Sequence, residues 1–213
     1  MSSRFGISGR RSLLLAGLAT CSAALTGCGV LRTGNATPTA YYALDAQSSG
    51  AAQPAPTAAA ATLIINSPAA AAGFDSPRMI YQREPGRLQR FAYSEWVDTP
   101  ARMLWPLLVT AARDSGVYRA VAISPGSAYG ERRLDSEILR LVQEFGPGPS
   151  RVRLTLRVWL IEEKSRRVLA QRDLEASAVA ASDDPAGGAR AANEAAATVL
   201  RALGRFLQDS AAL

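Results

Sequence analysis

The chain has 213 residues, a formal net charge of +6, two cysteines and no histidine. This composition excludes Ser-His-Asp and Cys-His catalysis and the usual zinc-finger sites. No pair of carboxylates has a spacing that suggests a shared catalytic site. We therefore expect no enzyme, no catalytic residue, no metal site and no cofactor.

Residues 1–27 have the features of a bacterial lipoprotein signal peptide. Three arginines between positions 4 and 11 precede an apolar run, residues 13–25, and no acidic residue occurs before Cys28. The run is too short to span a bilayer permanently. It ends in Leu25-Thr26-Gly27-Cys28, an arrangement typical of lipoprotein processing sites. We predict cleavage between Gly27 and Cys28, and acylation of Cys28 as the membrane anchor.

Other interpretations of this segment stay open. Cys21 also ends a stretch of small residues, but Thr20 precedes it where such sites have Gly, Ala or Ser. A plain secretory signal cut elsewhere would leave Cys28 as a free thiol in an oxidising compartment. Arg10-Arg11 also faintly resembles a twin-arginine export signal.

Removal of the signal lowers the net charge of +6 to +3, because three arginines and no acidic residues leave with it. Lys164 is the only lysine among 24 basic residues, which indicates the bias of a GC-rich genome and not phosphate recognition. We expect no nucleic-acid partner.

The mature chain is predicted to begin with a flexible tether, residues 28–39. At up to ~3.5 Å per residue, this tether could hold a fold some ~35 to 40 Å from the bilayer. Residues 40–213 suit a single domain. An aromatic strand, residues 41–45, is followed by an Ala/Pro/Gln/Ser-rich stretch, residues 46–61, which we predict to be a low-complexity loop.

A strand is predicted over residues 62–66, and a β-hairpin over residues 79–83 and 91–93. The hairpin turn is Glu84-Pro85-Gly86-Arg87. Proline sets φ for the second turn position, and glycine permits the positive φ of the third.

A helix is predicted to begin at Pro100, with Thr99 as its N-cap, and to end at Gly116. Its apolar stripe consists of positions 104, 107, 108 and 111. Pro106 lies inside this pattern, so we expect the helix to kink there or to start tighter than ideal.

Further strands are predicted over residues 117–123, 138–145 and 151–160. Apolar residues alternate through the last of these, at Val152, Leu154, Leu156, Val158 and Leu160. One face of this strand is therefore buried and the other is solvated. Residues 168–179 are predicted to return as its antiparallel partner, and we expect this pair of strands to form the centre of the sheet.

Asp184-Pro185 opens a final helix, whose apolar positions are Ala189, Ala192, Ala196, Val199, Leu203 and Phe206. The fold class predicted from these elements is α+β. We expect a two-layer domain with a mixed or mostly antiparallel sheet and two helices packed on one face.

Four stretches occur in an order that is typical of one protein family. They are the processing site at Cys28 followed by Tyr41-Tyr42-Ala43-Leu44-Asp45, residues 76–83, residues 88–96 with Thr99-Pro100, and residues 118–121. Together with the Ala-rich helix after Asp184, they resemble the ABC-type transport auxiliary lipoprotein family, which includes the paraquat-inducible protein C type.

The resemblance implies a periplasmic partner of a lipid-transporting ABC system. The implied protein partner carries mammalian-cell-entry domains, and the cargo is phospholipid or a related hydrophobic compound that moves between the inner and outer membranes. Gly29 stands where aspartate would retain a lipoprotein in the inner membrane, so we expect residence in the outer membrane, facing the periplasm. Whether the chain also forms a homo-oligomer stays open.

A candidate partner interface consists of Trp159, Arg157, Arg153 and Arg83. Trp159 lies on the predicted solvated face beside Arg157 and Arg153, and aromatic and arginine side chains are enriched at protein interfaces. Arg83 belongs to a group of arginines around the predicted hairpin. The alternative is that these arginines only form a solvated face of the domain and bind no partner.

Besides a histidine-free enzyme, which would need activity in the purified domain, two classes of function fit this sequence. The first is an acylated docking subunit of a transport assembly. The second is a structural or regulatory lipoprotein that acts on cell-wall synthesis or outer-membrane assembly. Pull-down from detergent extracts distinguishes them, because the first predicts mammalian-cell-entry proteins and the second predicts penicillin-binding or barrel-assembly proteins.

Overall fold

The structure is a computed structural model that describes residues 37–46, 61–126 and 128–213. The chain divides into two compact units, Met1–Thr37 and Pro38–Leu213, and every described helix and strand belongs to the second. The predicted signal peptide, Cys28, most of the tether and the interior of the low-complexity loop lie outside the described residues.

The sheet is organised around one long strand, β7 (Arg132–Glu144). One edge of β7 pairs along its whole length with β8 in antiparallel register, and β9 pairs in the same way with the far edge of β8. The other edge of β7 pairs in parallel with three short strands in succession. The bounds are β8 (Arg151–Glu162), β9 (Arg167–Val179), β2 (Thr62–Asn66), β3 (Ala69–Ala70) and β4 (Arg78–Glu84).

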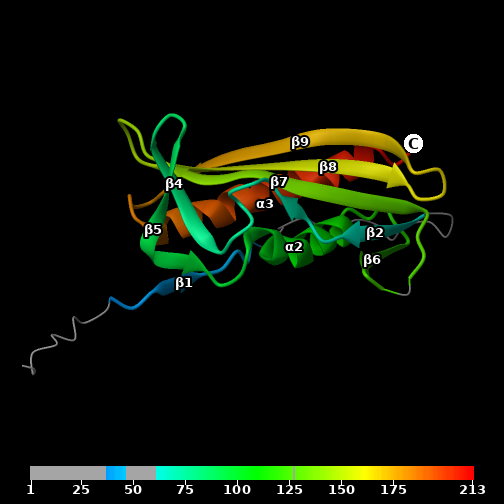
Figure 1. The fold of residues 1–213 in the computed structure, drawn as a ribbon. Coiled ribbons are helices and arrows are strands. Elements are labelled where there is room, and N and C mark those ends of the chain that lie inside the picture. The colour runs from blue at the N-terminus through cyan, green and yellow to red at the C-terminus, as the bar shows by residue number, and fades with distance from the viewer. Residues whose placement is uncertain (1–36, 47–60, 127) are drawn as a thin grey trace, which may run out of the picture. The chain divides into compact units, whose positions relative to one another are not determined.

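Two branches extend from the second edge of β7. In one branch, β6 (Ala120–Ser124) pairs in parallel with β2. In the other, β5 (Arg87–Trp96) forms a hairpin with β4, and β1 (Ala40–Tyr42) pairs in parallel with β5. Figure 1 shows β1, β4 and β5 together at one end of this unit, and β2 and β6 toward the other. The prediction of a mixed sheet is confirmed.

The two described helices, α2 (Pro100–Asp114) and α3 (Pro185–Asp209), lie on the same face of the sheet. Helix α3 packs on β8 and β9, and α2 packs on α3, β6 and β7. Because both helices lie on one face of the sheet, the predicted two-layer arrangement is confirmed.

The predicted N-caps of both helices are also confirmed. Thr99 accepts a hydrogen bond from the backbone N–H of Arg102, and Asp184 accepts one from the backbone N–H of Gly187.

The core lies between the sheet and the two helices. The predicted apolar residues of β8 are all buried there, as are the stripes of both helices, with Leu107 half-buried. Helix α2 continues through Pro106, whose side chain is exposed, and the chain leaves the helix through Gly116 at φ +68°.

Strand β7 begins at Arg132, six residues before the predicted start. Two features conceal this strand in the sequence. Ser136 and Gln143 occupy buried positions on it, and a bulge between Ile138 and Arg140 reverses the alternation of side chains. The expected central hairpin is also wrong in part, because β9 pairs only with β8 and β7 occupies the centre.

The other element boundaries differ by a few residues. Strand β1 covers Ala40–Tyr42 and β6 covers Ala120–Ser124, whereas the predictions were residues 41–45 and 117–123. Tyr118 precedes β6, and its side chain is buried against the core.

Candidate partner-binding surface

The sheet face opposite the helices carries the outward side chains of β7, β8 and β9, and we call it the β8 face. Along β8, the buried residues alternate with Arg153, Thr155, Arg157 and Trp159, which point outward and are half-buried. Neither α2 nor α3 packs on this side. Three of the four candidate interface residues, Trp159, Arg157 and Arg153, are therefore brought together on one strand face.

The arginines of the β8 face are held by carboxylates from the neighbouring strands. Arg157 donates two hydrogen bonds to Asp173, from Nε to Oδ1 at 2.7 Å and from Nη2 to Oδ2 at 2.8 Å. Arg153 lies between Glu144 and Glu175 and pairs with both. These hydrogen bonds raise the pKa of the Arg157 and Arg153 guanidinium groups and lower the pKa of Asp173.

The same pattern continues toward the other end of β7. Arg133 pairs with Glu163 at 2.7 Å and with Asp135 at 3.1 Å, and Arg132 pairs with Glu162 at 3.2 Å. Along β7 and β8, positive and negative side chains are therefore interleaved, and the paired arginines of the β8 face do not form a bare positive patch.

Trp159 is the aromatic residue of this face. Its indole N–H donates a hydrogen bond to Oε1 of Gln171 on β9 at 2.9 Å, and in the register of β7 it lies opposite Asp135. The ring is half-buried and its polar edge is already bonded. Trp159 consequently presents an oriented apolar surface among paired charges.

Arg83 lies on the other face of the sheet from Arg153. Gln82 pairs in register with Glu144, the partner of Arg153, whereas Tyr81, on the opposite face of β4 from Gln82, pairs with Gln143. The Arg83 guanidinium lies over the Phe145 ring, 4.8 Å from its centroid, and 5.6 Å from that of Tyr81. The structure therefore does not bring Arg83 together with the other three candidates.

The contacts of Arg83 belong to an aromatic cluster that sequence reasoning missed. The ring of Tyr81 lies 4.5 Å from that of Phe91 and 5.7 Å from that of Phe145, measured between centroids. Tyr81 and Phe91 each have an apolar neighbour, Ile80 and Ala92, so the alternation along the two hairpin strands gave no clear signal for this cluster. Phe145 comes from the end of β7, and its approach depends on the pairing of β4 with β7.

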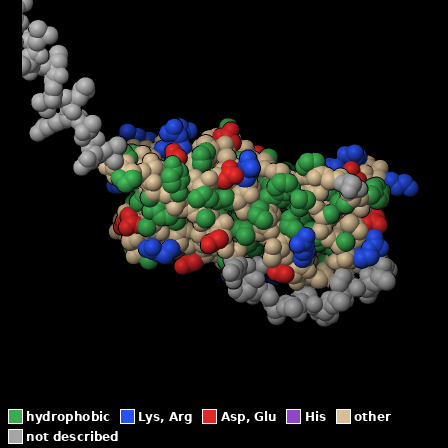
Figure 2. All heavy atoms as spheres, turned by 90° about the horizontal axis from the view of Figure 1, so that it is seen from below, with side chains coloured by type: hydrophobic (Ala, Val, Ile, Leu, Met, Phe, Trp, Pro, Cys, Tyr) green, Lys and Arg blue, Asp and Glu red, His purple; other side chains and the backbone are tan. Residues whose placement is uncertain are grey.

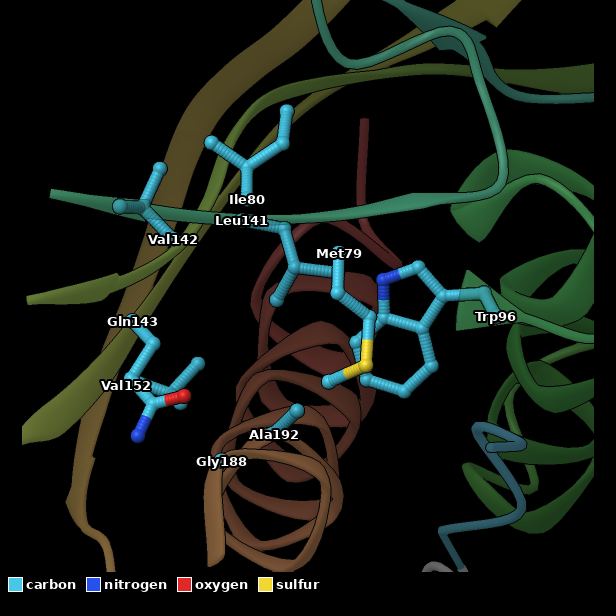
Figure 3. A pocket seen from close by; sticks show the side chains of 9 residues that line it. All are labelled: Met79, Ile80, Trp96, Leu141, Val142, Gln143, Val152, Gly188 and Ala192. Carbon is cyan, nitrogen blue, oxygen red and sulfur yellow. The ribbon is translucent and has the colours of Figure 1, made fainter. Parts of the chain in front are cut away.

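Figure 3 shows a small cavity between the sheet and the first turns of α3. It is lined by side chains of β4, β7 and β8 together with Trp96, Gly188 and Ala192. Its volume is about 10 Å³, which is room for one water molecule at most. A ligand pocket usually has a volume of roughly 300 to 1,000 Å³, so this cavity cannot hold a lipid chain.

Figure 2 shows the side of the unit that lies at the bottom of Figure 1. Hydrophobic side chains lie along the middle of this side, and charged side chains lie mostly around them. Neither α2 nor α3 has the length and hydropathy needed to cross a bilayer. In the part of the chain that the structure describes, no group of three His, Cys, Asp or Glu residues could hold a metal ion.

A family model for the ABC-type transport auxiliary lipoprotein component matches residues 42–204, from β1 into α3. The chain belongs to this family. The resemblance inferred from the sequence is confirmed, and membership indicates a lipoprotein associated with ABC-type transport. A comparison with curated protein sequences found no match.

Two solved structures with TM-scores above 0.6 share the fold. A DUF330 protein from Xanthomonas campestris is 24% identical, and the match covers 81% of this chain and 96% of that one, with a TM-score of 0.67. An uncharacterized protein is 12% identical over 80% of this chain and 99% of that one, with a TM-score of 0.64. The PelC dodecamer from Paraburkholderia phytofirmans is 16% identical over 72% of this chain and 92% of that one, with a TM-score of 0.42, which is too distant to indicate an assembly of this chain.

Proposed function

We propose that this protein is an outer-membrane lipoprotein of the periplasm that docks on the mammalian-cell-entry component of an ABC transporter. In this role it helps lipid or another hydrophobic compound to pass between the two membranes. The match of the family model to nearly all of the folded unit is the observation that carries the proposal.

The proposed anchor is the acylated thiol of Cys28. Its support is the sequence around it, where an apolar run ends in a small residue and cysteine, and where Gly29 replaces the aspartate of inner-membrane retention. The described unit begins at Pro38, ten residues after Cys28. An anchored domain would thus stay close to the membrane.

We propose that the chain acts by binding, without a catalytic step. The absence of histidine from the sequence supports this, since the common hydrolase mechanisms need an imidazole base. A docking subunit needs only a surface that matches its partner.

The proposed docking surface is the β8 face. Its arginines are already held by carboxylates, and Trp159 is held by Gln171. Side chains that are ordered before binding lose less conformational entropy when a partner arrives. An oriented tryptophan surrounded by paired charges is a suitable anchor for an interface.

Affinity purification of the full acylated chain from detergent extracts tests the proposed partner. We expect proteins with mammalian-cell-entry domains to co-purify. Recovery of penicillin-binding or barrel-assembly proteins in their place would refute the transport role and favour the cell-wall or outer-membrane alternative.

Trp159→Ala tests the docking surface. We expect binding to the purified partner to weaken by about 1 to 4 kcal/mol, because the indole would be lost from the interface centre. Ile123→Ala, which shortens an exposed apolar side chain on β6, at the far edge of the sheet from β8, is the control. Calorimetry measures affinity and circular dichroism verifies folding. Unchanged affinity of a folded Trp159→Ala variant would place the interface elsewhere.

A further inference from the structure

Large apolar side chains are exposed together on the β1–β5 edge of the sheet. Of the nine large hydrophobic residues exposed in the described part of the chain, four belong to this edge or follow it directly: Tyr41 (63% exposed), Leu88 (47%), Tyr93 (56%) and Val97 (59%). Ala40 pairs with Ser94, and Tyr41 pairs with Glu95. Tyr41 and Tyr93 are consequently close neighbours on adjacent strands.

Positive charge accompanies these apolar groups on the β4–β5 hairpin. Arg78 and Arg90 are exposed, and neither forms an ion pair with a described carboxylate. This differs from the β8 face, where Arg153 and Arg157 are paired. The hairpin can thus offer guanidinium groups to an external anion without first breaking internal pairs.

The exposed tyrosines and unpaired arginines together form what we call the hairpin surface, defined by Tyr41, Tyr93, Arg78 and Arg90. Tyrosine has an apolar ring and a polar tip, and it is enriched at the boundary between lipid and water. Arginine binds phosphate through its planar fork of donors. This combination matches the headgroup layer of a bilayer that contains anionic phospholipid.

Only a few residues of sequence separate this surface from the predicted anchor. Strand β1 begins at Ala40, twelve residues after Cys28, and twelve residues extend at most roughly 40 Å. Tethering at such a length raises the local concentration of bilayer at the β1–β5 edge. Contacts that would be too weak for a free domain can then be populated.

The short length of β1 argues against addition of a partner's strand at this edge. Strand β1 has three residues, so it offers few backbone groups for an added strand. Recognition at this edge must therefore rely mainly on the side chains. Those side chains include Tyr41, Tyr93 and Arg78, together with one carboxylate, the half-buried Glu95, which pairs in register with Tyr41 and Arg78.

We propose that the hairpin surface lies against the anionic headgroup layer of the membrane that holds the lipid anchor. This contact orients the domain relative to the bilayer. The inference rests on the proposed acylation of Cys28, and it adds a second contact with the membrane that the anchor alone does not supply.

The test uses the mature acylated protein in vesicles of phosphatidylethanolamine and phosphatidylglycerol. Ala92→Cys introduces a thiol for an environment-sensitive fluorophore at an exposed position of β5, and Ala120→Cys does the same at the exposed start of β6. We expect brominated lipids to quench the label at position 92 several-fold more than the label at position 120. Equal quenching of the two labels would overturn the proposal.

The double variant Tyr41→Ser/Tyr93→Ser, combined with Ala92→Cys, tests the surface itself. We expect quenching at position 92 to fall to the level at position 120, while the protein remains with the vesicles through Cys28. Neutral phosphatidylcholine vesicles should also weaken the quenching. Quenching that is unchanged in both cases, or that needs the transport partner, would overturn the membrane contact.

Mass spectrometry of the peptide that contains Cys28 distinguishes failure of the anchor from failure of this inference. An unmodified Cys28 would refute the anchor and the membrane contact together. Acylated Cys28 with equal quenching at positions 92 and 120 would refute only the membrane contact, and would leave the lipoprotein assignment unaffected.

Discussion

Leu156 and Arg157 are neighbours on β8 that point to opposite faces of the sheet. Leu156 is fully buried between the sheet and the helices, and Arg157 pairs with Asp173 at the surface. Leu156→Ala should lower the free energy of unfolding by about 2 to 5 kcal/mol, because it leaves a cavity in the core.

Arg157→Ala is the matched control for that prediction. Its effect on stability should be small, because surface ion pairs contribute little. Thermal unfolding of both variants measures the difference. Equal losses of melting temperature would contradict the assignment of the two faces of β8.

Tyr118 gives the stability a dependence on high pH. Burial raises the pKa of its phenol to about 12, whereas the phenol in the unfolded chain has its ordinary pKa of about 10. As the pH rises from 10 toward 12, the unfolded state loses a proton that the folded state keeps. Stability should therefore fall over this range by about 1 to 2 kcal/mol from this group.

Denaturant titrations of the wild-type protein and of Tyr118→Phe at pH 9 and pH 11 test this prediction. The variant has no phenol to ionise, so its stability should decline less between the two conditions. A decline of the same size in both proteins would show that Tyr118 is not the responsible group.

At the scale of elements, the first turn of α3 depends on glycine. A Cβ at position 188 would lie 2.1 Å from Oε1 of Gln143. The Gln143 side chain cannot easily move, because its Nε2 donates to Ser150 at 2.9 Å and to the carbonyl of Asp184 at 3.2 Å. Gly188→Ala should therefore lower the melting temperature, although alanine favours helix formation.

Gly204→Ala is the control on the same helix. Nothing lies within 4 Å of a Cβ there, so the variant should gain about 0.5 to 1 kcal/mol from helix propensity. Differential scanning calorimetry of the two variants compares their opposite effects. Stabilisation by Gly188→Ala would mean that α3 does not approach β7 as closely as described.

At the scale of the whole molecule, the position of the protein in the cell depends on Cys28. Gly27 precedes Cys28, while Thr20 precedes Cys21, so we expect Cys28 to be the sole acylated residue. Cys28→Ala should release the protein from membranes and abolish metabolic labelling with palmitate, and Cys21→Ala should do neither. Persistent labelling of Cys28→Ala would favour Cys21.

Membrane fractionation tests the expected location. On a sucrose gradient, the wild-type protein should migrate with outer-membrane markers, because Gly29 replaces the aspartate of inner-membrane retention. Migration with inner-membrane markers would contradict this expectation without affecting the family assignment.

The sequence by itself determined the features that depend on local patterns. Alternation along residues 151–160 predicted the two faces of β8, because successive side chains of a strand point to opposite sides. Thr99 and Asp184, each followed by proline, located the starts of both helices, because the cap is formed with the N–H groups of the next few residues. The family resemblance likewise rested on the order of short stretches.

Tertiary structure decided what depends on residues far apart in the chain. The early start of β7 is stabilised by partners from β2, β3 and β8, and no local pattern reveals it across the buried Ser136 and the bulge. The pairing of β4 with β7 places Arg83 and Arg153 on different faces of the sheet, and the sequence does not reveal this pairing. Gly188 is needed because Gln143, forty-five positions earlier, approaches it. Such contacts arise when the sheet and helices pack, since distance in space is then set by topology and not by sequence separation.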